Sequence, residues 1–252
     1  MQILTYPTLS ISPEILAEVM KSLCKEKITV VTNANKITEH FIRYGNSSTV
    51  ETGLDLETNT QSFIRLAGNK LSFSKIIALN RFHCPKFYTR DFIPGENQYP
   101  ILIRSTLYGK RGEGITVVKN KDKFLEHIKV NYHWTPFVKT EFELRVHIAG
   151  GKILRVFKKV FTENEEEEYP IRNMMNGYHF SLRENIENYP KVIEIVNKLW
   201  QIPIFKGQFL SLDVGWDKEK KEYFIFEGNT SPGLNDNTAL EYGKFLVEKL
   251  GL

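Results

Sequence analysis

Two spacings of apolar residues run through this sequence, and each predicts one kind of element. Apolar residues that recur every three or four positions give a helix one apolar face. This spacing predicts helices at residues 13–24, 71–79, 123–130, 190–200 and 238–250. Short apolar or alternating runs bounded by turn residues predict strands or extended segments at residues 27–32, 41–44, 86–89, 101–104, 115–118, 135–138, 143–147, 152–157, 209–213 and 223–229. The mixture predicts an α/β (α+β) protein that starts with a small α/β unit.

Polar residues stand inside the last of these apolar runs. Because side chains alternate along a strand, we expect Glu227 and Asn229 on one face and Phe224 and Phe226 on the other. The charged residues 217–221 that precede this run predict a hairpin turn. An acid and an amide on one strand face therefore need an explanation.

The hairpin also brings in a second acid. If it is centred near Lys220, Asp213 lies opposite Glu227 on the neighbouring strand. Two adjacent carboxylates repel unless a cation joins them, and oxygen donors without a nearby His or Cys suit Mg²⁺ or Mn²⁺ rather than zinc. A cross-strand salt bridge of the two acids with Lys or Arg explains the same pattern equally well. Both interpretations stay open at this point.

A loop rich in glycine and positive charge joins two of the predicted strands, at residues 105–114. The residues that give it this character are Gly109, Lys110, Arg111, Gly112 and Gly114. Glycines let a backbone approach phosphate oxygens closely and direct its N–H groups at them. The loop is not a Walker A motif, because no Gly-Lys-Ser/Thr opens a helix, and a strand follows where the dinucleotide fingerprint has a helix. A glycine-rich hairpin taken by itself is explained by an ordinary turn that binds no ligand.

The clearest hairpin in the sequence joins residues 143–147 to residues 152–157. Alternation puts Glu143, Arg145 and His147 on one face of its first strand. For His147, solvated surface polarity is a simpler explanation than a chemical role.

Composition limits the class of protein. With 252 residues, of which 41% are hydrophobic and 12% aromatic, the chain can bury a core in one domain or in two or three lobes. Residues 91–100 are the strongest linker candidate. No apolar run approaches the roughly 20 residues that cross a bilayer, and the N-terminus lacks a signal-like segment, so we expect a cytoplasmic protein without a membrane partner. Cys24 and Cys84 are isolated, which favours free thiols.

The net charge of +4 is spread along the chain, and the isoelectric point is near 8.8. This balance weakly indicates an anionic partner. A nucleotide meets the requirement as well as a nucleic acid does, and no zinc-finger spacing or RNP-like aromatic motif supports the latter. The acidic run at residues 163–168 is typical of a solvated loop.

The order of these features resembles that of the ATP-grasp superfamily of carboxylate-amine ligases, over about residues 65–250. Within this superfamily, the order of features is most similar to that of the ribosomal-protein-modifying and phage-type amidoligase branches. The specific segments are the Glu-x-Asn-x-x-Pro-Gly block at residues 227–233 and the run at residues 142–147. The resemblance implies an ATP-grasp fold, in which two α+β lobes grip ATP behind a short α/β N-terminal lobe. The implied lobes are residues 1–66, 67–136 and 137–252.

The resemblance also implies roles for individual residues. Asp213, Glu227 and Asn229 would bind Mg²⁺ or Mn²⁺, and Arg145 and Arg104 would act in catalysis. The implied ATP contacts are Lys70, Arg104, Gly109, Lys110, Gly112, Gly114, Phe137, Val138, Glu143 and Lys158, with Lys159 as the alternative to Lys158. Arg104 departs from the family pattern, since most members have lysine there; a guanidinium still binds phosphate, with altered geometry.

The implied activity is formation of an amide bond through an acylphosphate, with release of ADP and phosphate. The partners would be ATP, a carboxylate and an amine, which belong to a small molecule, a protein tail or a modified base. Two alternatives stay open: an ATP-grasp kinase, and a non-catalytic module that binds nucleotides or nucleic acid.

Overall fold

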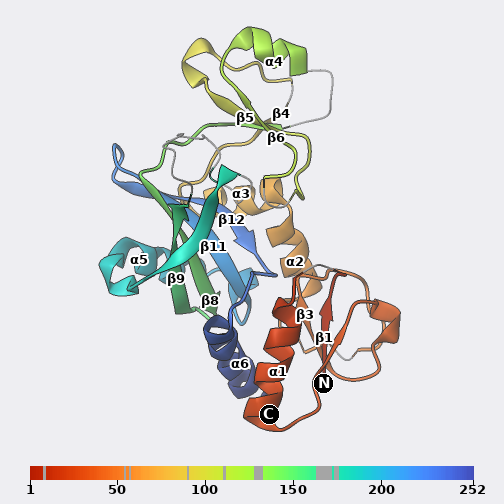
Figure 1. Cartoon of the computed structure of the whole chain (residues 1–252). Helices are drawn as coiled ribbons and strands as arrows, with labels where there is room; N and C mark the ends of the chain where they lie inside the picture. The colour runs from red at the N-terminus through yellow and green to blue at the C-terminus, as the bar shows by residue number, and fades with distance from the viewer. Residues whose placement is uncertain are drawn as a thin grey trace.

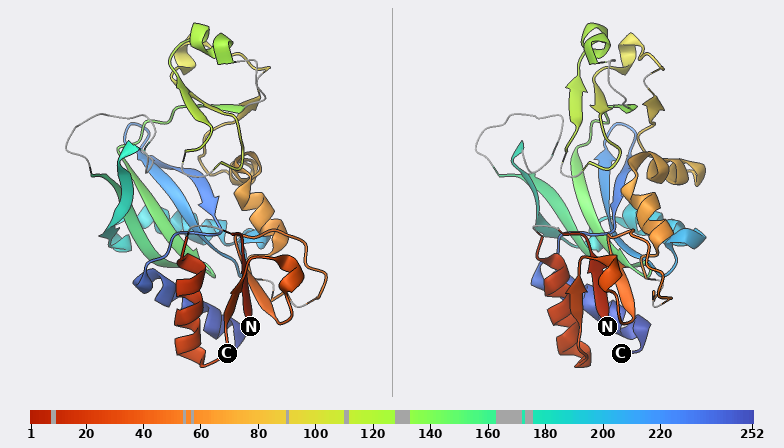
Figure 2. Two further views of the ribbon diagram at one scale, coloured as in Figure 1. Left: turned by 45° about the vertical axis from the view of Figure 1, so that its right-hand side comes forward. Right: turned by 90° about the vertical axis from the view of Figure 1, so that its right-hand side faces the viewer.

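Three sheets follow one another along the computed structural model, which describes residues 1–7, 10–53, 55–56, 58–89, 91–109, 112–127, 133–162, 172 and 176–252 (Figure 1). A parallel sheet from the N-terminal residues lies at one end, and a small four-stranded sheet lies at the other. A five-stranded sheet stands between them, and the other two views keep this order (Figure 2). The two chain ends lie near each other at the N-terminal end of the molecule.

The N-terminal sheet is parallel and has β1 (Gln2–Thr5) between β2 (Thr29–Val31) and β3 (Phe41–Tyr44). The helix α1 (Ser12–Cys24) follows β1 and packs against the last helix of the chain, α6 (Asp236–Leu250). The predicted helices and strands of this region are confirmed, whereas the spacing of apolar residues missed β1. Contact between the first and last helices joins the N-terminal lobe to the C-terminal part of the fold.

The small lobe contains β4 (Tyr88–Thr89), β5 (Ile101–Arg104), β6 (Ile115–Val118), α4 (Lys121–His127) and β7 (His133–Pro136). Its strands are antiparallel in the order β4-β7-β5-β6, and Trp134 lies at the centre of its core. The indole of Trp134 donates to the carbonyl of Phe92 at 2.8 Å. This bond holds residues 91–100, the linker candidate, within the small lobe, so that segment is a loop of the lobe rather than a boundary.

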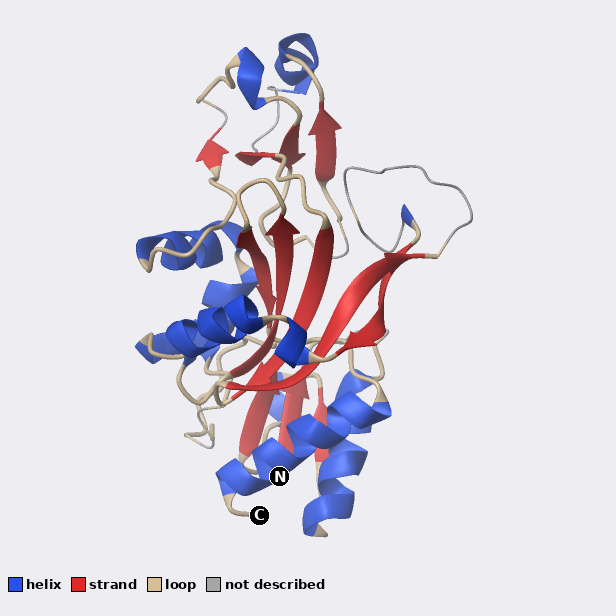
Figure 3. Ribbon diagram, turned by 90° about the vertical axis from the view of Figure 1, so that its left-hand side faces the viewer, coloured by secondary structure: helices blue, strands red, loops and turns tan. Residues whose placement is uncertain are grey.

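The central sheet is antiparallel, in the order β10-β9-β8-β11-β12. Its strands are β8 (Phe142–Ala149), β9 (Lys152–Phe161), β10 (Tyr178–Glu184), β11 (Phe209–Asp217) and β12 (Glu222–Asn229). One face carries the helices α2 (Gln61–Gly68), α3 (Lys70–Leu79) and α5 (Pro190–Leu199). Figure 3 shows helices gathered along that side of the strands.

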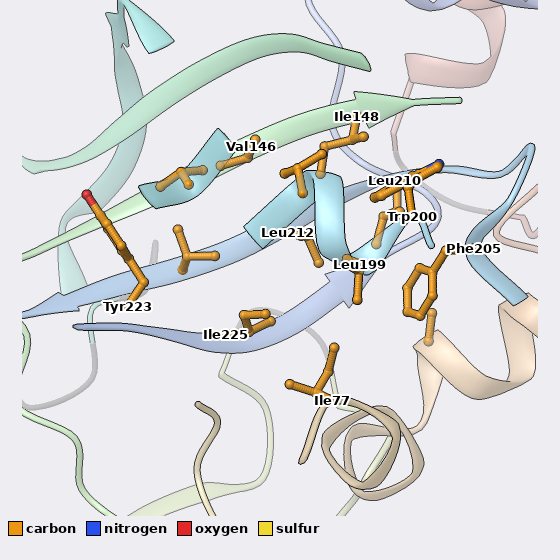
Figure 4. Close-up of a cluster of buried hydrophobic side chains, with 14 of the residues drawn as sticks. Ile77, Val146, Ile148, Leu199, Trp200, Phe205, Leu210, Leu212, Tyr223 and Ile225 are labelled. Carbon is orange, nitrogen blue, oxygen red and sulfur yellow. The ribbon is translucent and has the colours of Figure 1, made fainter. Parts of the chain in front are cut away.

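Alternate residues of the central sheet build the main core on the helix face. Leu144, Val146, Leu210, Leu212, Val214 and Ile225 are all buried there. They pack with Ile77, Leu199 and Phe205 from the helix side (Figure 4). Because side chains alternate, the residues between them point to the opposite face of the sheet. The polar residues of β8 and β11 therefore share one surface.

A β-bulge decides which residues of β12 reach that surface. Asp213 pairs with Glu227, but the next residue, Val214, pairs with Ile225, so Phe226 is an extra residue on β12. The prediction that Phe226 points away from Glu227 is wrong. A Cβ placed on Gly215, two residues after Asp213, would lie 2.5 Å from the Phe226 ring, so this ring is on the polar face.

Two further elements were not predicted. The helix α2 is only 8 residues long, and the Thr60 side chain caps it by accepting from the Phe63 N–H. The strand β10 alternates Tyr178, Phe180 and Leu182 with polar residues, a strand pattern that went unrecognised. Among the helices that the structure describes, none has the length and apolar character to cross a membrane.

Close packing of α3 on β12 requires a glycine. A Cβ on Gly228 would lie 2.8 Å from the Phe73 ring and 3.0 Å from Leu210. We predict that Gly228→Ala lowers the free energy of unfolding by about 1–3 kcal/mol, because the core must shift to admit a methyl group. Urea denaturation measures the loss. Gly68→Ala is the matched control, since a Cβ there meets nothing within 4 Å; equal stability of the two variants would contradict the packing argument.

Candidate active site

A row of charged residues crosses three strands on the polar face of the central sheet. Asp213 on β11 lies directly opposite Glu227 on β12 and, on its other side, opposite Arg145 on β8. The predicted register of Asp213 and Glu227 is therefore confirmed. Two carboxylates and a guanidinium meet where the central sheet faces the small lobe.

Both carboxylates have cationic partners. Arg145 donates from Nε and Nη2 to the two oxygens of Asp213, each at 2.8 Å, and this bidentate geometry is the strongest form of such a pair. Lys70 Nζ lies 3.1 Å from Glu227 Oε2. The salt bridges of the second interpretation are thus present. They do not test the metal interpretation, because a cation and a lysine compete for the same carboxylate oxygens.

The oxygen donors fit a small divalent cation. Asn229 Oδ1 accepts the Ser231 N–H at 3.0 Å and retains a second lone pair. The Glu227 side chain is 34% exposed and the Asp213 side chain 9% exposed, so one carboxylate is accessible and the other largely buried. Within the described part of the chain, no three His, Cys, Asp or Glu side chains gather in one place. A metal here would need both acids and the amide, a donor set that suits Mg²⁺ or Mn²⁺.

Burial and nearby carboxylates have opposing effects on the pKa of the two arginines at this site. Burial lowers the pKa of Arg145, but the charge and hydrogen bonds of Asp213 outweigh burial and raise the pKa above its ordinary value. Burial also lowers the pKa of Arg104, and the nearby charge of Glu227 opposes that effect. Arg104 Nε is buried without a hydrogen-bond partner among the described residues. Its guanidinium therefore has a donor to offer beside Glu227.

The glycine loop docks on the start of α3. The Lys70 N–H donates to the Leu107 carbonyl at 3.1 Å, and Lys70 Nζ donates to the Gly109 carbonyl at 2.8 Å. Gly112 and Gly114 have φ values of +87° and +70°, which favour glycine. Lys110 and Arg111 lie outside the described residues. Lys70 thus contacts both Glu227, a candidate metal ligand, and the glycine loop.

The segment between the two lobes holds a second polar cluster. Phe137 and Val138 follow β7 and lead into β8, and the Phe137 N–H donates to the Pro100 carbonyl. Glu143 accepts from Lys159 Nζ at 2.5 Å. Arg172 joins the cluster, because its carbonyl accepts from Lys159 and its guanidinium donates to the Thr140 carbonyl, at 2.6 and 2.8 Å. The connection between the lobes is therefore fixed by charged side chains.

The structure separates Lys158 from Lys159. Lys158 pairs with Leu144 and lies over the Phe142 ring on the helix face, whereas its alternative, Lys159, does not; the ATP contact of either lysine stays a prediction. A bulge near Leu154 shifts the parity of β9, and Lys159 reaches the polar face instead.

Phe180 closes this side of the polar face. Its ring centre lies 4.2 Å from the Arg145 guanidinium carbon and 4.6 Å from Lys159 Nζ. Sequence reasoning missed Phe180, although the alternation in β10 signals it.

No protein-family model matches this sequence, and no curated protein matches it. Solved structures match the fold over almost the whole chain. The RimK domain protein ATP-grasp from Sphaerobacter thermophilus DSM 20745 is 11% identical, with a TM-score of 0.66 and coverage of 97% of this chain and 98% of that chain. The D-alanine–D-alanine ligase of Bacillus anthracis complexed with ATP is 14% identical, with a TM-score of 0.66 and coverage of 97% and 93%.

A third similar structure is the RiPP-associated ATP-grasp ligase of Chryseobacterium gregarium in complex with ADP and a leader and core peptide. It is 12% identical, with a TM-score of 0.62 and coverage of 98% of this chain and 96% of that chain. At these identities the likeness establishes the fold. The chain has the ATP-grasp fold, and the likeness includes the N-terminal lobe, where the sequence resemblance was weakest.

The bidentate pair at the centre of the site predicts a stability effect. Arg145→Met leaves the largely buried Asp213 carboxylate without its partner, and we expect a loss of about 2 kcal/mol, less than for a fully buried pair. Asp213→Asn in the same chain should restore part of this loss. Urea denaturation of the two single variants and the double variant measures the coupling, and purely additive losses would contradict it.

Proposed function

We propose that this chain is an ATP-dependent carboxylate-amine ligase that forms an amide bond through an acylphosphate and releases ADP and phosphate. The observation that carries the proposal is the Asp213–Glu227 pair, which lies where the glycine loop, the interlobe connection and the central sheet of an ATP-grasp fold meet. The lobes at residues 1–66, 67–136 and 137–252 are proposed as its functional units, with helices α2 and α3 packed on the central sheet.

ATP would lie between the small lobe and the polar face of the central sheet. Backbone groups of Phe137 and Val138 would face the base. The Phe226 ring, which lies beside Gly215 as Thr140 also does, offers an aromatic surface for it. Glu143 would bind the ribose.

Phosphate oxygens would be held by positive side chains and backbone N–H groups. The residues proposed for this role are Lys70, Arg104, Lys159, Gly109, Lys110, Gly112 and Gly114. The partnerless Nε of Arg104 supports this placement, because a buried donor without a partner is unfavourable until an acceptor reaches it.

Asp213, Glu227 and Asn229 would hold Mg²⁺ or Mn²⁺. A divalent cation at this point supplies neutralisation of phosphate charge. Lys70 and Arg145 now neutralise the two carboxylates. When a metal takes that role, both side chains become available to anionic oxygens of ATP and of the acyl substrate.

The proposed reaction has two steps. A carboxylate oxygen of the first substrate attacks the γ-phosphorus, the bond to the β-phosphate oxygen breaks, and ADP leaves. The amine then attacks the acyl carbon, loses a proton and expels phosphate. The residues of this chain orient the reactants and stabilise the charge that builds on oxygen, with Arg145 and Arg104 nearest the transferred group. Docking of the glycine loop on Lys70 would keep water from the acylphosphate.

The product identifies the reaction. We predict that a screen of pooled carboxylates and amines with Mg-ATP releases ADP, and that the product mass equals the sum of acid and amine less one water. A product that gains phosphate would instead indicate a kinase. Protection by Mg-ATP against unfolding without turnover would indicate a non-catalytic module. Peptides belong in the screen, because one structure similar to this chain was solved with a peptide.

Two substitutions connect the product to the site. Asp213→Asn and Glu227→Gln should each lower ADP release by at least about 100-fold, since loss of one metal ligand removes several kcal/mol of charge stabilisation. Glu222→Gln is the matched control on the same strand, because that side chain lies at the turn end of β12, where it pairs with His83. Normal ATP turnover in both site variants would overturn the assignment.

The two neighbouring lysines of β9 provide a second test. Lys159→Ala should raise the KM for ATP by about tenfold, because it removes a cation from the polar cluster beside Glu143. Lys158→Ala should leave the KM unchanged, since Lys158 lies on the other face. Steady-state kinetics decides between them, and equal effects would show that the two faces are assigned wrongly.

A further inference from the structure

A second polar row runs beside the charged row on the same face of the central sheet. Ser211 lies two residues before Asp213 and therefore shares its face. It is directly opposite Asn229 on β12 and directly opposite His147 on β8. Residues opposite each other on antiparallel strands have Cβ atoms about 4.5–5.5 Å apart, so these three side chains are immediate neighbours.

The Ser211 hydroxyl is buried and lacks a partner. The residue is 0% exposed, and its Oγ makes no hydrogen bond to any described residue. Buried hydroxyls are normally paired, so an orphan next to a candidate metal ligand calls for a role. Both neighbours of this hydroxyl carry groups that match its donor and acceptor.

The imidazole of His147 has a defined tautomer. Tyr242 donates its hydroxyl hydrogen to the Leu210 carbonyl at 3.0 Å, so the 3.3 Å contact with His147 Nδ1 requires the imidazole to donate. His147 is 2% exposed, and burial together with the charge of Arg145 lowers its pKa to about 3, so the ring is neutral. A neutral ring has one N–H. Nε2 is therefore an acceptor, on a residue that faces Ser211.

The amide of Asn229 has a defined orientation as well. Its Oδ1 accepts the Ser231 N–H at 3.0 Å, which identifies the opposite atom, Nδ2, as the donor side of the amide. Ser211 is the residue across the strand pair from it. A hydroxyl that accepts from Nδ2 and donates to His147 Nε2 would satisfy every group in the row.

We propose that Ser211 is a positioning residue for the third metal ligand. In the metal-loaded protein its hydroxyl accepts from Asn229 Nδ2 and donates to His147 Nε2. A hydrogen-bond chain then runs from Asn229 through Ser211, His147 and Tyr242 to the Leu210 carbonyl, and it holds Oδ1 of Asn229 toward the cation. The inference rests on the proposed function, because it assigns Asn229 to the metal.

Metal affinity provides the first test. Calorimetric titration of Mn²⁺ into the full chain with ADP should give about tenfold weaker binding for Ser211→Ala than for wild type, the usual size of an effect behind a metal ligand. The melting temperature of metal-free Ser211→Ala should not fall, because its hydroxyl makes no bond to lose. Ser74→Ala is the matched control: it removes a buried hydroxyl bonded to the Pro85 carbonyl, away from this row, and should leave the Mn²⁺ affinity unchanged.

The imidazole provides a test that does not depend on metal. Nitrogen NMR of the His147 ring in metal-free protein should show a protonated Nδ1 and a bare Nε2. With Mg²⁺ and ADP, the Nε2 resonance should shift in wild type and stay in place in Ser211→Ala. A protonated Nε2, or equal Mn²⁺ affinity in wild type and Ser211→Ala, would overturn the proposal. Failure of wild type itself to bind Mn²⁺ with ADP would instead overturn the proposed function from which it starts.

Discussion

The constraint on which the rest of this structure depends is the repulsion of two carboxylates that face each other across neighbouring strands. At a separation near 5 Å and an effective dielectric constant near 20, two such charges repel by about 3 kcal/mol. Asp213 and Glu227 are in this position, so cations must reach both. Arg145 comes from the adjacent strand, but Lys70 comes from a helix that lies elsewhere in the sequence. Because Lys70 also holds the Gly109 carbonyl, neutralising one acid joins α3, the glycine loop and the central sheet.

The opposite face of the same sheet makes this arrangement possible. Leu210, Leu212 and Val214 are fully buried under the helices, so β11 is anchored by its apolar residues while Ser211 and Asp213 face the polar side. The bulge at Phe226 then lets β12 bury Ile225 and still present Glu227 and Asn229 to the site. Without the extra residue, Ile225 and Glu227 would share a face, and either the core or the site would be lost.

Alternation and turn residues predicted much of this fold, and the limits of the prediction have one main cause. The pairing of Asp213 with Glu227 was predicted correctly, but the turn alone does not produce it. Asp217 pairs with Glu222, and this register without a bulge would place Asp213 opposite Phe226. The face of Phe226 was predicted wrongly because this residue is the extra one in a bulge, and a bulge in β9 likewise decides that Lys159 rather than Lys158 reaches the polar face. A bulge depends on how two strands pair and leaves no mark in the apolar pattern of one strand. The ion pair between Lys70 and Glu227 is likewise set by helix packing.

Two cations at this site have positions that the fold alone does not favour. Lys70 stands at the first residue of α3, where a positive charge opposes the helix dipole by about 0.3–1 kcal/mol. Arg104 is largely buried with Nε unpartnered, which also opposes folding. Both lie beside Glu227, and Lys70 also holds the Gly109 carbonyl of the glycine loop. Natural sequences break local rules mainly at functional sites. A phosphate group between these cations would accept from Arg104 and place an anion at the start of α3, and so would relieve both costs together.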